Sequence, residues 1–441
     1  VSSASALHPT LRSNPNKPTL SGMPVLNESA LQGIASHKYV SGDYTWLDNK
    51  MQPWWNWVAE RMPWSFHPNL ITLLGTLGVV LGYFVWVPYS PNFYYEEAPL
   101  WVYLAAAAGI FWSQTMDAVD GKQARRTGAS SPLGQMFDHG CDAFSTHLLS
   151  LMAASAVGSG TPWKVMFLFV SPALCFWVGT VAEYHTGKLQ CNDGTTGVTE
   201  GQMMLIGIQL LSAVKGPWLW NTPIVQPGSF QLPLVGYSLQ LSTPFTLGDV
   251  GIILNAYQTL RFCFVVACLI ITQYTEYDII LANGFEKPKA PPPRTAEPKM
   301  AIGRKQRGLK AAVLQSSIGL LMAGLAYGWT DAFARGGQEM EEGMGLRVIL
   351  HCCGMLFAWQ TTVLIVAHMA LQPVPMAWQA WVPCLFAASN TVYGWADPYT
   401  TNAIVLAWLC LSYLVYVIRV INEITTHLKI QCFSMAYLKS K

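Results

Sequence analysis

Ten long apolar stretches dominate the chain, and short polar or charged segments separate them. Their expected limits are 69–88, 100–117, 136–158, 163–183, 201–220, 250–272, 311–330, 347–370, 377–395 and 402–420. A helix needs about 20 mainly apolar residues to cross a bilayer, and most of these stretches contain an uncharged core long enough to do so. The sixth is the weakest, because Arg261 interrupts it; this residue should snorkel or form an interior ion pair. The pattern predicts an all-α polytopic membrane protein.

Composition supports the same class of protein. Of the 441 residues, 52% are hydrophobic and 11% are charged. In a soluble domain, about a quarter of the residues are charged. The formal net charge of +2 gives no reason to expect nucleic acid as a partner. The expected surroundings are therefore a lipid bilayer.

The charged loops predict the orientation of the bundle. The segment 287–310 holds eight basic residues and should be cytosolic, because short loops rich in Lys and Arg stay on that side. Basic residues after the second and the tenth stretch fall on the same side. The segment 331–346, which contains Glu339, Glu341 and Glu342, falls on the opposite side. With ten spans, both chain ends are expected in the cytosol.

The region before the first stretch has two parts. Residues 1–39 begin with a run rich in Ser, Asn and Pro, which predicts a disordered N-terminal tail. Residues 40–66 carry five tryptophans among polar residues. That mixture predicts an N-terminal amphipathic helix lying at the membrane interface.

One segment carries a dense chemical pattern, D-x2-D-G-x2-A-R-x8-G-x3-D-x3-D. Its fixed positions are Asp117, Asp120, Gly121, Ala124, Arg125, Gly134, Asp138 and Asp142. On helices, the first four positions share one face and the last three share another. The gap between them contains Gly128 and Pro132, which suit a turn. Two helices could then present two aspartates each to a common centre.

Four carboxylates at a membrane boundary repel one another and lose hydration, so the cluster is stable only if something strongly positive lies among them. Divalent metal with oxygen ligands meets that need, so we expect two Mg2+ or Mn2+ ions among the four aspartates. Arg125 offers several donors to a phosphate, and the two motif glycines leave room for a ligand beside the backbone. The pattern indicates phosphoryl transfer from a phosphate anhydride to a hydroxyl.

The hydroxyl also needs a base. His139 borders the expected metal face and can accept a proton near neutral pH, but the spacing fits a packing residue equally well. Asp142 is the rival base, although metal ligation lowers the basicity of a carboxylate. Glu200 could orient or strengthen His139. It could also only favour a helix N-terminus, where Thr199 and Gln202 fit a capping box.

The pattern resembles the signature of the CDP-alcohol phosphotransferase family, and every signature position is filled. The run Asp138-His139-Gly140-Cys141-Asp142, the Val198-Thr199-Glu200 triplet and the ten-span layout are similar to its choline/ethanolamine phosphotransferase branch. The resemblance implies that His139 takes the proton from the hydroxyl, that Glu200 assists, and that Asn69 lies near the nucleotide. The N-terminal tail and the acidic loop 331–346 depart from the family.

The resemblance also implies a reaction, in which CDP-choline or CDP-ethanolamine donates its phosphoalcohol to diacylglycerol. The products would be phosphatidylcholine or phosphatidylethanolamine, and CMP. It implies a homodimer in the endoplasmic reticulum or Golgi membrane, with a cytosolic active site. Residues 67–272 are then the catalytic membrane region, 273–310 a cytosolic basic linker, 311–420 a four-helix membrane region and 421–441 a cytosolic tail.

Two other functions and the choice of headgroup stay open. The enzyme could instead use CDP-diacylglycerol and a polar alcohol. An ion or proton transporter could also use intramembrane carboxylates, but it would need charges near several span midpoints rather than a cluster at one edge. Choline and ethanolamine cannot be distinguished from the sequence, because many aromatic side chains could line a headgroup pocket.

Overall fold

The computed structural model describes residues 24–40, 42–93, 98–232, 237–241, 243–282, 308–336 and 344–435. Ten of its helices cover the ten expected spans: α3 (Pro68–Phe84), α4 (Leu100–Thr127), α5 (Pro132–Val157), α6 (Pro162–Thr186), α7 (Val198–Lys215), α8 (Leu247–Ala282), α10 (Leu309–Arg335), α11 (Gly345–Met369), α12 (Trp378–Tyr393) and α13 (Pro398–Leu428). Five of them, α6, α8, α10, α11 and α13, are long and apolar enough to cross a membrane. The all-α polytopic class is confirmed.

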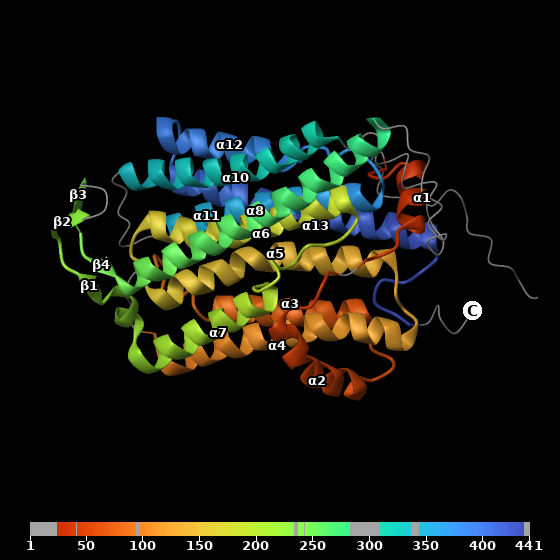
Figure 1. Cartoon of the computed structure of the whole chain (residues 1–441), viewed down its shortest axis with the longest axis horizontal. Helices are drawn as coiled ribbons and strands as arrows, with labels where there is room; N and C mark the ends of the chain where they lie inside the picture. Colours follow the sequence, from red (N-terminus) through yellow and green to blue (C-terminus); the bar gives the residue numbers. More distant parts are fainter. Residues whose placement is uncertain are drawn as a thin grey trace, which may run out of the picture.

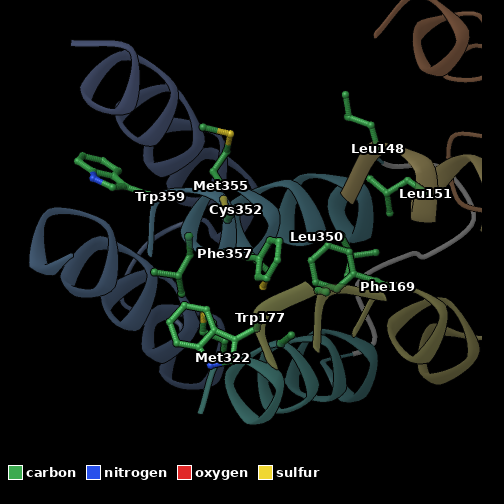
Figure 2. Packing of buried hydrophobic residues seen from close by; sticks show 14 of the residues in the cluster. Leu148, Leu151, Phe169, Trp177, Met322, Leu350, Cys352, Met355, Phe357 and Trp359 are labelled. Carbon is green, nitrogen blue, oxygen red and sulfur yellow. The ribbon is translucent and has the colours of Figure 1, made fainter. Parts of the chain in front are cut away.

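Helix α11 lies at the centre of the bundle. In the apolar 18-residue stretch of α11, 89% of the residues are buried, whereas the corresponding shares are 22% in α8 and 17% in α13. It packs on α5, α6, α10, α12 and α13. Figure 2 shows part of this core, where Leu350 and Phe357 of α11 lie close to Phe169 and Trp177 of α6. Helix α11 therefore joins the C-terminal helices to the two helices that precede α7.

Helices α3 and α4 approach each other through glycines. A Cβ atom at Gly109 of α4 would lie 2.5 Å from the carbonyl oxygen of Gly78, and a Cβ atom at Gly75 would lie 2.9 Å from Cβ of Met116. Small residues at an interface between membrane helices allow this close backbone contact. The contact fixes α4, which carries the first half of the motif, against the middle of α3.

Helix α2 (Trp46–Arg61) occupies most of the expected interfacial segment. Thr45 and Asp48 form a capping box at its N-terminus, which satisfies backbone N–H groups that a helix leaves free. Trp55 and Ala59 are buried, in a cluster with Met116 and Val119 of α4, while Trp46, Trp54 and Trp57 are exposed. The helix is amphipathic, as expected; its place at the membrane interface stays a prediction.

The expected disordered tail, residues 1–39, is wrong in part, because α1 (Glu28–Ser36) forms within it. Asn27 caps this helix, and Ile34 is buried in a cluster with residues of α11 and α13. Glu423 of α13 accepts hydrogen bonds of 2.9 and 2.8 Å from the backbone N–H groups of Val25 and Leu26. The segment is ordered by docking rather than by its own composition. Residues 1–23 lie outside the described residues.

Other boundaries also differ from expectation. Helix α13 continues to Leu428, past the expected start of the tail at residue 421, and α8 continues to Ala282. Most of the expected linker lies outside the described residues. Between α7 and α8 the chain forms a short 3-10 helix and two unexpected two-stranded sheets. The strands are β1 (Pro223–Val225) with β4 (Phe245–Thr246), and β2 (Gly228–Leu232) with β3 (Tyr237–Leu241). They lie at the end of the bundle opposite α1 (Figure 1).

Candidate metal centre and active site

The turn between α4 and α5 sets the geometry of the motif. Helix α4 ends at Thr127, and Gly128 follows with a φ of 70°, the left-handed conformation that glycine adopts without strain. Ser131 then caps α5 by accepting a 3.1 Å hydrogen bond from the N–H of Gly134, and Pro132 occupies the first helical position. The expected turn is confirmed, and it brings the two aspartate-bearing helices together.

Three of the four motif aspartates form one cluster. Asp117 of α4 and Asp138 and Asp142 of α5 each offer a carboxylate oxygen within 4.8 Å of the other two. Atom Oδ1 of Asp138 is buried and has no hydrogen-bond partner among the described residues. A buried, unsatisfied carboxylate oxygen is costly unless something positive binds it. The donor set consists of hard oxygens, so it fits Mg2+ or Mn2+.

Asp120 lies beside this cluster but is not part of it. Its Oδ2 atom accepts a hydrogen bond from the hydroxyl of Thr72 on α3, and only 7% of the residue is exposed. In this geometry α3 orients one carboxylate of the motif while the other three face one another. The sequence predicted that all four aspartates would hold metal. The structure groups three of them, and Asp120, one turn after Asp117 on α4, is hydrogen-bonded to α3 instead.

The motif arginine lies at the edge of the site. Arg125 is exposed and has no hydrogen bond or ion pair within the described part of the chain, and a Cβ atom at Gly121 would lie 3.5 Å from its Nη1 atom. Ala124 lies half-buried on the same helix. The neighbouring Arg126 is engaged instead, since its Nη1 atom donates 2.9 Å hydrogen bonds to the carbonyl oxygens of Ala59 and Met62. Of these two arginines, Arg125 is therefore the one that is free to contact a phosphate.

Asn69 of α3 and Gly134 of α5 are neighbours. A Cβ atom at Gly134 would lie 3.5 Å from Oδ1 of Asn69, and Asn69 is buried at the start of α3. The segment after α13 also reaches this point: the Sγ atom of Cys432 lies 3.6 Å from Nδ2 of Asn69. The ring of Phe433 packs edge-on against Phe137 of α5, with centroids 5.5 Å apart. Sequence reasoning missed this segment, since nothing local marks its contacts.

His139 is buried and faces a group that the sequence analysis did not assign to it. Its Nδ1 atom lies 3.8 Å from Oε2 of Glu183, near the end of α6. Glu183 is also 3.9 Å from Nε2 of His368 on α11 and accepts a 2.9 Å hydrogen bond from Nε2 of Gln135. The sequence did contain a signal for Glu183: it is an ionisable residue at the end of an apolar span, and such residues are rare without a function.

Tyr39 approaches His139 from the N-terminal side, with ring centroids 6.0 Å apart. Burial raises the pKa of the Tyr39 phenol, and nearby groups that include Cys191 and the carboxylates of Glu183 and Asp138 raise it further. The phenol is therefore neutral at physiological pH. It brings the segment that follows α1 to the edge of the site.

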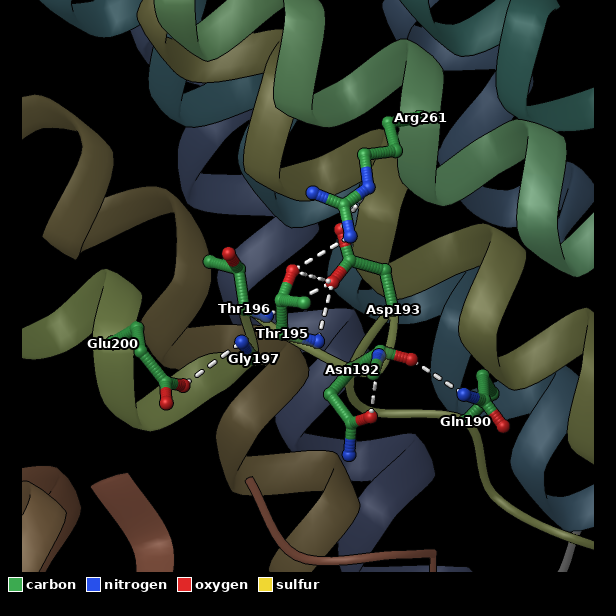
Figure 3. Close-up of polar contacts among 9 residues, drawn as sticks. Gln190, Asn192, Asp193, Thr195, Thr196, Gly197, Glu200 and Arg261 are labelled. Carbon is green, nitrogen blue, oxygen red and sulfur yellow. Dashed lines mark hydrogen bonds and ion pairs between the residues drawn. The ribbon is translucent and has the colours of Figure 1, made fainter. Parts of the chain in front are cut away.

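The structure does not bring Glu200 to His139. The Glu200 carboxylate accepts a 2.9 Å hydrogen bond from the N–H of Gly197, just before α7 begins (Figure 3). The cap thus falls at Gly197, two residues before the Thr199 position that the sequence suggested. This contact is the one expected of an acid at a helix N-terminus. That Glu200 assists His139 stays a prediction.

Arg261 forms the expected ion pair. Its Nε atom lies 3.3 Å from Oδ2 of Asp193, and its Nη2 atom donates a 2.7 Å hydrogen bond to the hydroxyl of Thr195 (Figure 3). Burial raises the pKa of Asp193, but hydrogen bonds from Thr196 and Thr195 together with the Arg261 charge outweigh it and hold that pKa below its usual value. The loop that leads into α7 is thereby tied to α8.

Comparison with known proteins confirms the class that the motif predicted. Residues 65–227 match the family CDP-alcohol phosphatidyltransferase. Within it, the chain is similar to the protein named cholinephosphotransferase 1. The Xenopus laevis protein is 38% identical over 228 residues, which cover 51% of this chain and 53% of that protein.

Other relatives agree. The Homo sapiens cholinephosphotransferase 1 is 37% identical over 216 residues, covering 48% of this chain and 52% of that protein. An uncharacterised CDP-alcohol phosphatidyltransferase class-I family protein from Dictyostelium discoideum is 40% identical over 214 residues, which cover 48% of this chain and 53% of that protein. The match thus spans about half the length of these relatives. The family match at residues 65–227 contains the whole motif.

Proposed function

We propose that the protein transfers phosphocholine or phosphoethanolamine from the CDP-alcohol to the free hydroxyl of diacylglycerol and releases CMP. One observation carries the proposal: Asp117, Asp138 and Asp142 gather their oxygens within 4.8 Å of one another, beside a buried histidine. The relatives named cholinephosphotransferase support the choice of donor. The apolar helices around the site suit an acceptor that is dissolved in the membrane.

Each residue of the site has a proposed role in this reaction. Two Mg2+ or Mn2+ ions held by Asp117, Asp138 and Asp142, with Asp120 beside them, would neutralise the diphosphate and the charge on the entering and leaving oxygens. Arg125 contacts a phosphate oxygen. Asn69 and its neighbour Gly134, together with Gly121 and Ala124 of α4, line the nucleotide side of the site in this proposal.

His139 accepts the proton of the acceptor hydroxyl. The hydroxyl oxygen then forms a bond to the β-phosphorus of the CDP-alcohol, and the bond from that phosphorus to the bridging oxygen breaks. The bridging oxygen leaves with CMP. Atoms and charge balance, since the proton rests on the imidazole until product leaves.

We further propose that the site opens to the cytosol, where the water-soluble donor is found. The basic residues of segment 287–310 support this orientation. The membrane is that of the endoplasmic reticulum or the Golgi, and the enzyme acts as a homodimer, as the family resemblance implies.

A single assay of the purified protein in nanodiscs tests the reaction. CDP-choline and CDP-ethanolamine, each with diacylglycerol and Mg2+ or Mn2+, should release CMP and yield phospholipid, and excess chelator should abolish both. Release of CMP only from CDP-diacylglycerol with a polar alcohol would establish the alternative donor. Transport of ions without CMP release would establish the transporter.

A competition assay decides the headgroup. Both CDP-alcohols are supplied in one reaction, and the product lipids are separated by headgroup. We propose that both are used, which predicts a ratio near unity. A bias of more than about a hundredfold, roughly 2.7 kcal/mol of discrimination, would mean that the enzyme is specific for one donor.

A further inference from the structure

We infer that Glu183 is the positioning residue of the base: it holds the His139 imidazole through Nδ1 and so directs Nε2 toward the acceptor hydroxyl. This inference rests on the proposed function and deepens it. It also gives the C-terminal half a part in the site, because His368 of α11 shares the same carboxylate. Glu200, the acid that the family resemblance suggested for this role, is turned to Gly197 instead.

The carboxylate of Glu183 is enclosed. Only 3% of the residue is exposed, and its ion-pair partners within the described part of the chain are two histidines, His139 and His368. A buried carboxylate without a cation or hydrogen-bond donors is strongly disfavoured. The imidazoles of His139 and His368 and the amide of Gln135 therefore stabilise the Glu183 charge, and this charge in turn orients the three side chains.

The two oxygens of Glu183 differ in their surroundings. Oε1 accepts the 2.9 Å hydrogen bond from Gln135 and lies 3.9 Å from His368. Oε2 lies 3.8 Å from Nδ1 of His139 and receives no hydrogen bond from any described residue. That distance is about 0.8 Å longer than an ordinary N–H···O hydrogen bond. A small rotation of either side chain closes it, as happens when catalytic contacts tighten in the substrate complex.

Gln135 fixes the position of the carboxylate from the other side. It lies one helical turn before His139 on α5, so the two side chains share a face. Because its amide nitrogen donates to Glu183, its oxygen Oε1 is left to accept the 2.8 Å hydrogen bond from Nε2 of His37. His37 in turn packs edge-on against His368, with ring centroids 5.3 Å apart. The carboxylate is thus held from α5, α11 and the segment after α1.

This arrangement assigns different tasks to the two nitrogens of His139. An acceptor at Nδ1 keeps the proton of the neutral ring on that nitrogen, which leaves the lone pair on Nε2. When the hydroxyl proton arrives on Nε2, the Glu183 charge stabilises the imidazolium that forms. The carboxylate does not itself take the proton, and it touches neither substrate nor the metal cluster. It acts only through His139.

The test uses the full-length enzyme in nanodiscs with saturating metal. Glu183→Ala should lower kcat about a hundredfold, within the range that a general base contributes, with KM for the CDP-alcohol and the metal concentration for half-activation within about twofold of wild type. Glu183→Gln keeps an acceptor oxygen for Nδ1 but loses the charge. It should recover part of the loss, to about tenfold below wild type.

A double-mutant comparison separates positioning from support of the fold. In a His139→Ala background, Glu183→Gln should cause no further loss of kcat, because the residue it acts through is gone. A further loss as large as in the wild-type background would overturn the inference. So would a Glu183→Ala variant with normal kcat, or one whose loss lies only in metal activation.

Asp249→Asn is the matched control. Asp249 is a half-buried carboxylate of α8 that lies 2.8 Å from Nζ of Lys164, at the end of α6 opposite Glu183. Its replacement should leave kcat unchanged. Wild-type protein that releases no CMP from either CDP-alcohol would defeat the proposed function itself, whereas an active wild type with an unaffected Glu183→Ala variant would defeat only this inference.

Discussion

The N-terminal half of the bundle, α3 to α8, and the C-terminal half, α10 to α13, differ in what their sequences reveal. The first half carries the complete motif, and the second has no recognisable chemical pattern. In the structure, however, the second half supplies α11, the most enclosed of the candidate membrane spans, and His368, which shares a carboxylate with His139. A half without a motif can still support the side chains that the other half uses for chemistry.

Helix α5 is one of the places where the two halves meet, together with α6. One of its faces carries Asp138 and Asp142 toward α4, and α11 packs on another. A Cβ atom at Gly354 of α11 would lie 2.5 Å from the ring of His147 on α5. A Cβ atom at Gly140, within the motif, would lie 4.0 Å from Oγ1 of Thr362, so α11 also reaches α5 beside the site. Four predictions test how the work is divided between the halves.

The largest effect is expected in the motif itself. Asp138→Ala removes part of the charge that holds the ions, which is worth several kcal/mol in the transition state, so CMP release should fall about a thousandfold or more. Mg2+ or Mn2+ should raise the unfolding temperature of the wild type but not of this variant. Equal stabilisation of both proteins by metal would mean that Asp138 is not a ligand.

The next effect separates the two candidate bases within the first half. His139→Ala should lower kcat by about 10²–10⁴ and leave the affinity for the CDP-alcohol intact. Asp142→Ala should weaken metal activation as well as turnover. Donor affinity measured by competition with a labelled nucleotide distinguishes the two. An equal loss of affinity in both variants would make His139 a binding residue.

A smaller effect addresses the second half. Gly354→Ala forces a methyl group against His147, and such overpacking costs about 1–3 kcal/mol; we expect a lower unfolding temperature and a partial loss of activity. Gly324→Ala on α10 is the matched control, because nothing lies within 4 Å of its added Cβ atom, and it should be neutral or slightly stabilising. Thermal unfolding in detergent measures both. An unchanged Gly354→Ala variant would show that α11 does not brace α5.

The smallest effect is expected at Glu200. Glutamine can still accept the hydrogen bond from Gly197, so Glu200→Gln loses only the favourable charge at a helix N-terminus, about 0.3–1 kcal/mol. Its kcat should stay within about twofold of wild type, and its pH–rate profile should not move. A shifted profile would instead establish the assisting role that the family resemblance implies.

Features set by neighbouring residues were predictable. The face shared by Asp117 and Asp120 follows from helix geometry, and the turn before α5 follows from Gly128, Ser131 and Pro132. The ten long helices follow from long apolar runs. In each case the decisive interaction joins residues close in sequence, or joins the residues with their surroundings as a whole. The family could be predicted for the same reason, because its signature is a local spacing.

Only the tertiary structure decided which acid faces His139. Glu183 and Glu200 both lie near helix ends that connect to the same loop, and their distances from His139 depend on how α6 and α7 cross α5. The same holds for Asp120, whose carboxylate accepts a hydrogen bond from Thr72 of α3. It also holds for the segment that leads into α1, where Val25 donates a hydrogen bond to Glu423, 398 residues further along the chain. Such contacts depend on the packing of whole helices, and no spacing along the chain encodes that packing.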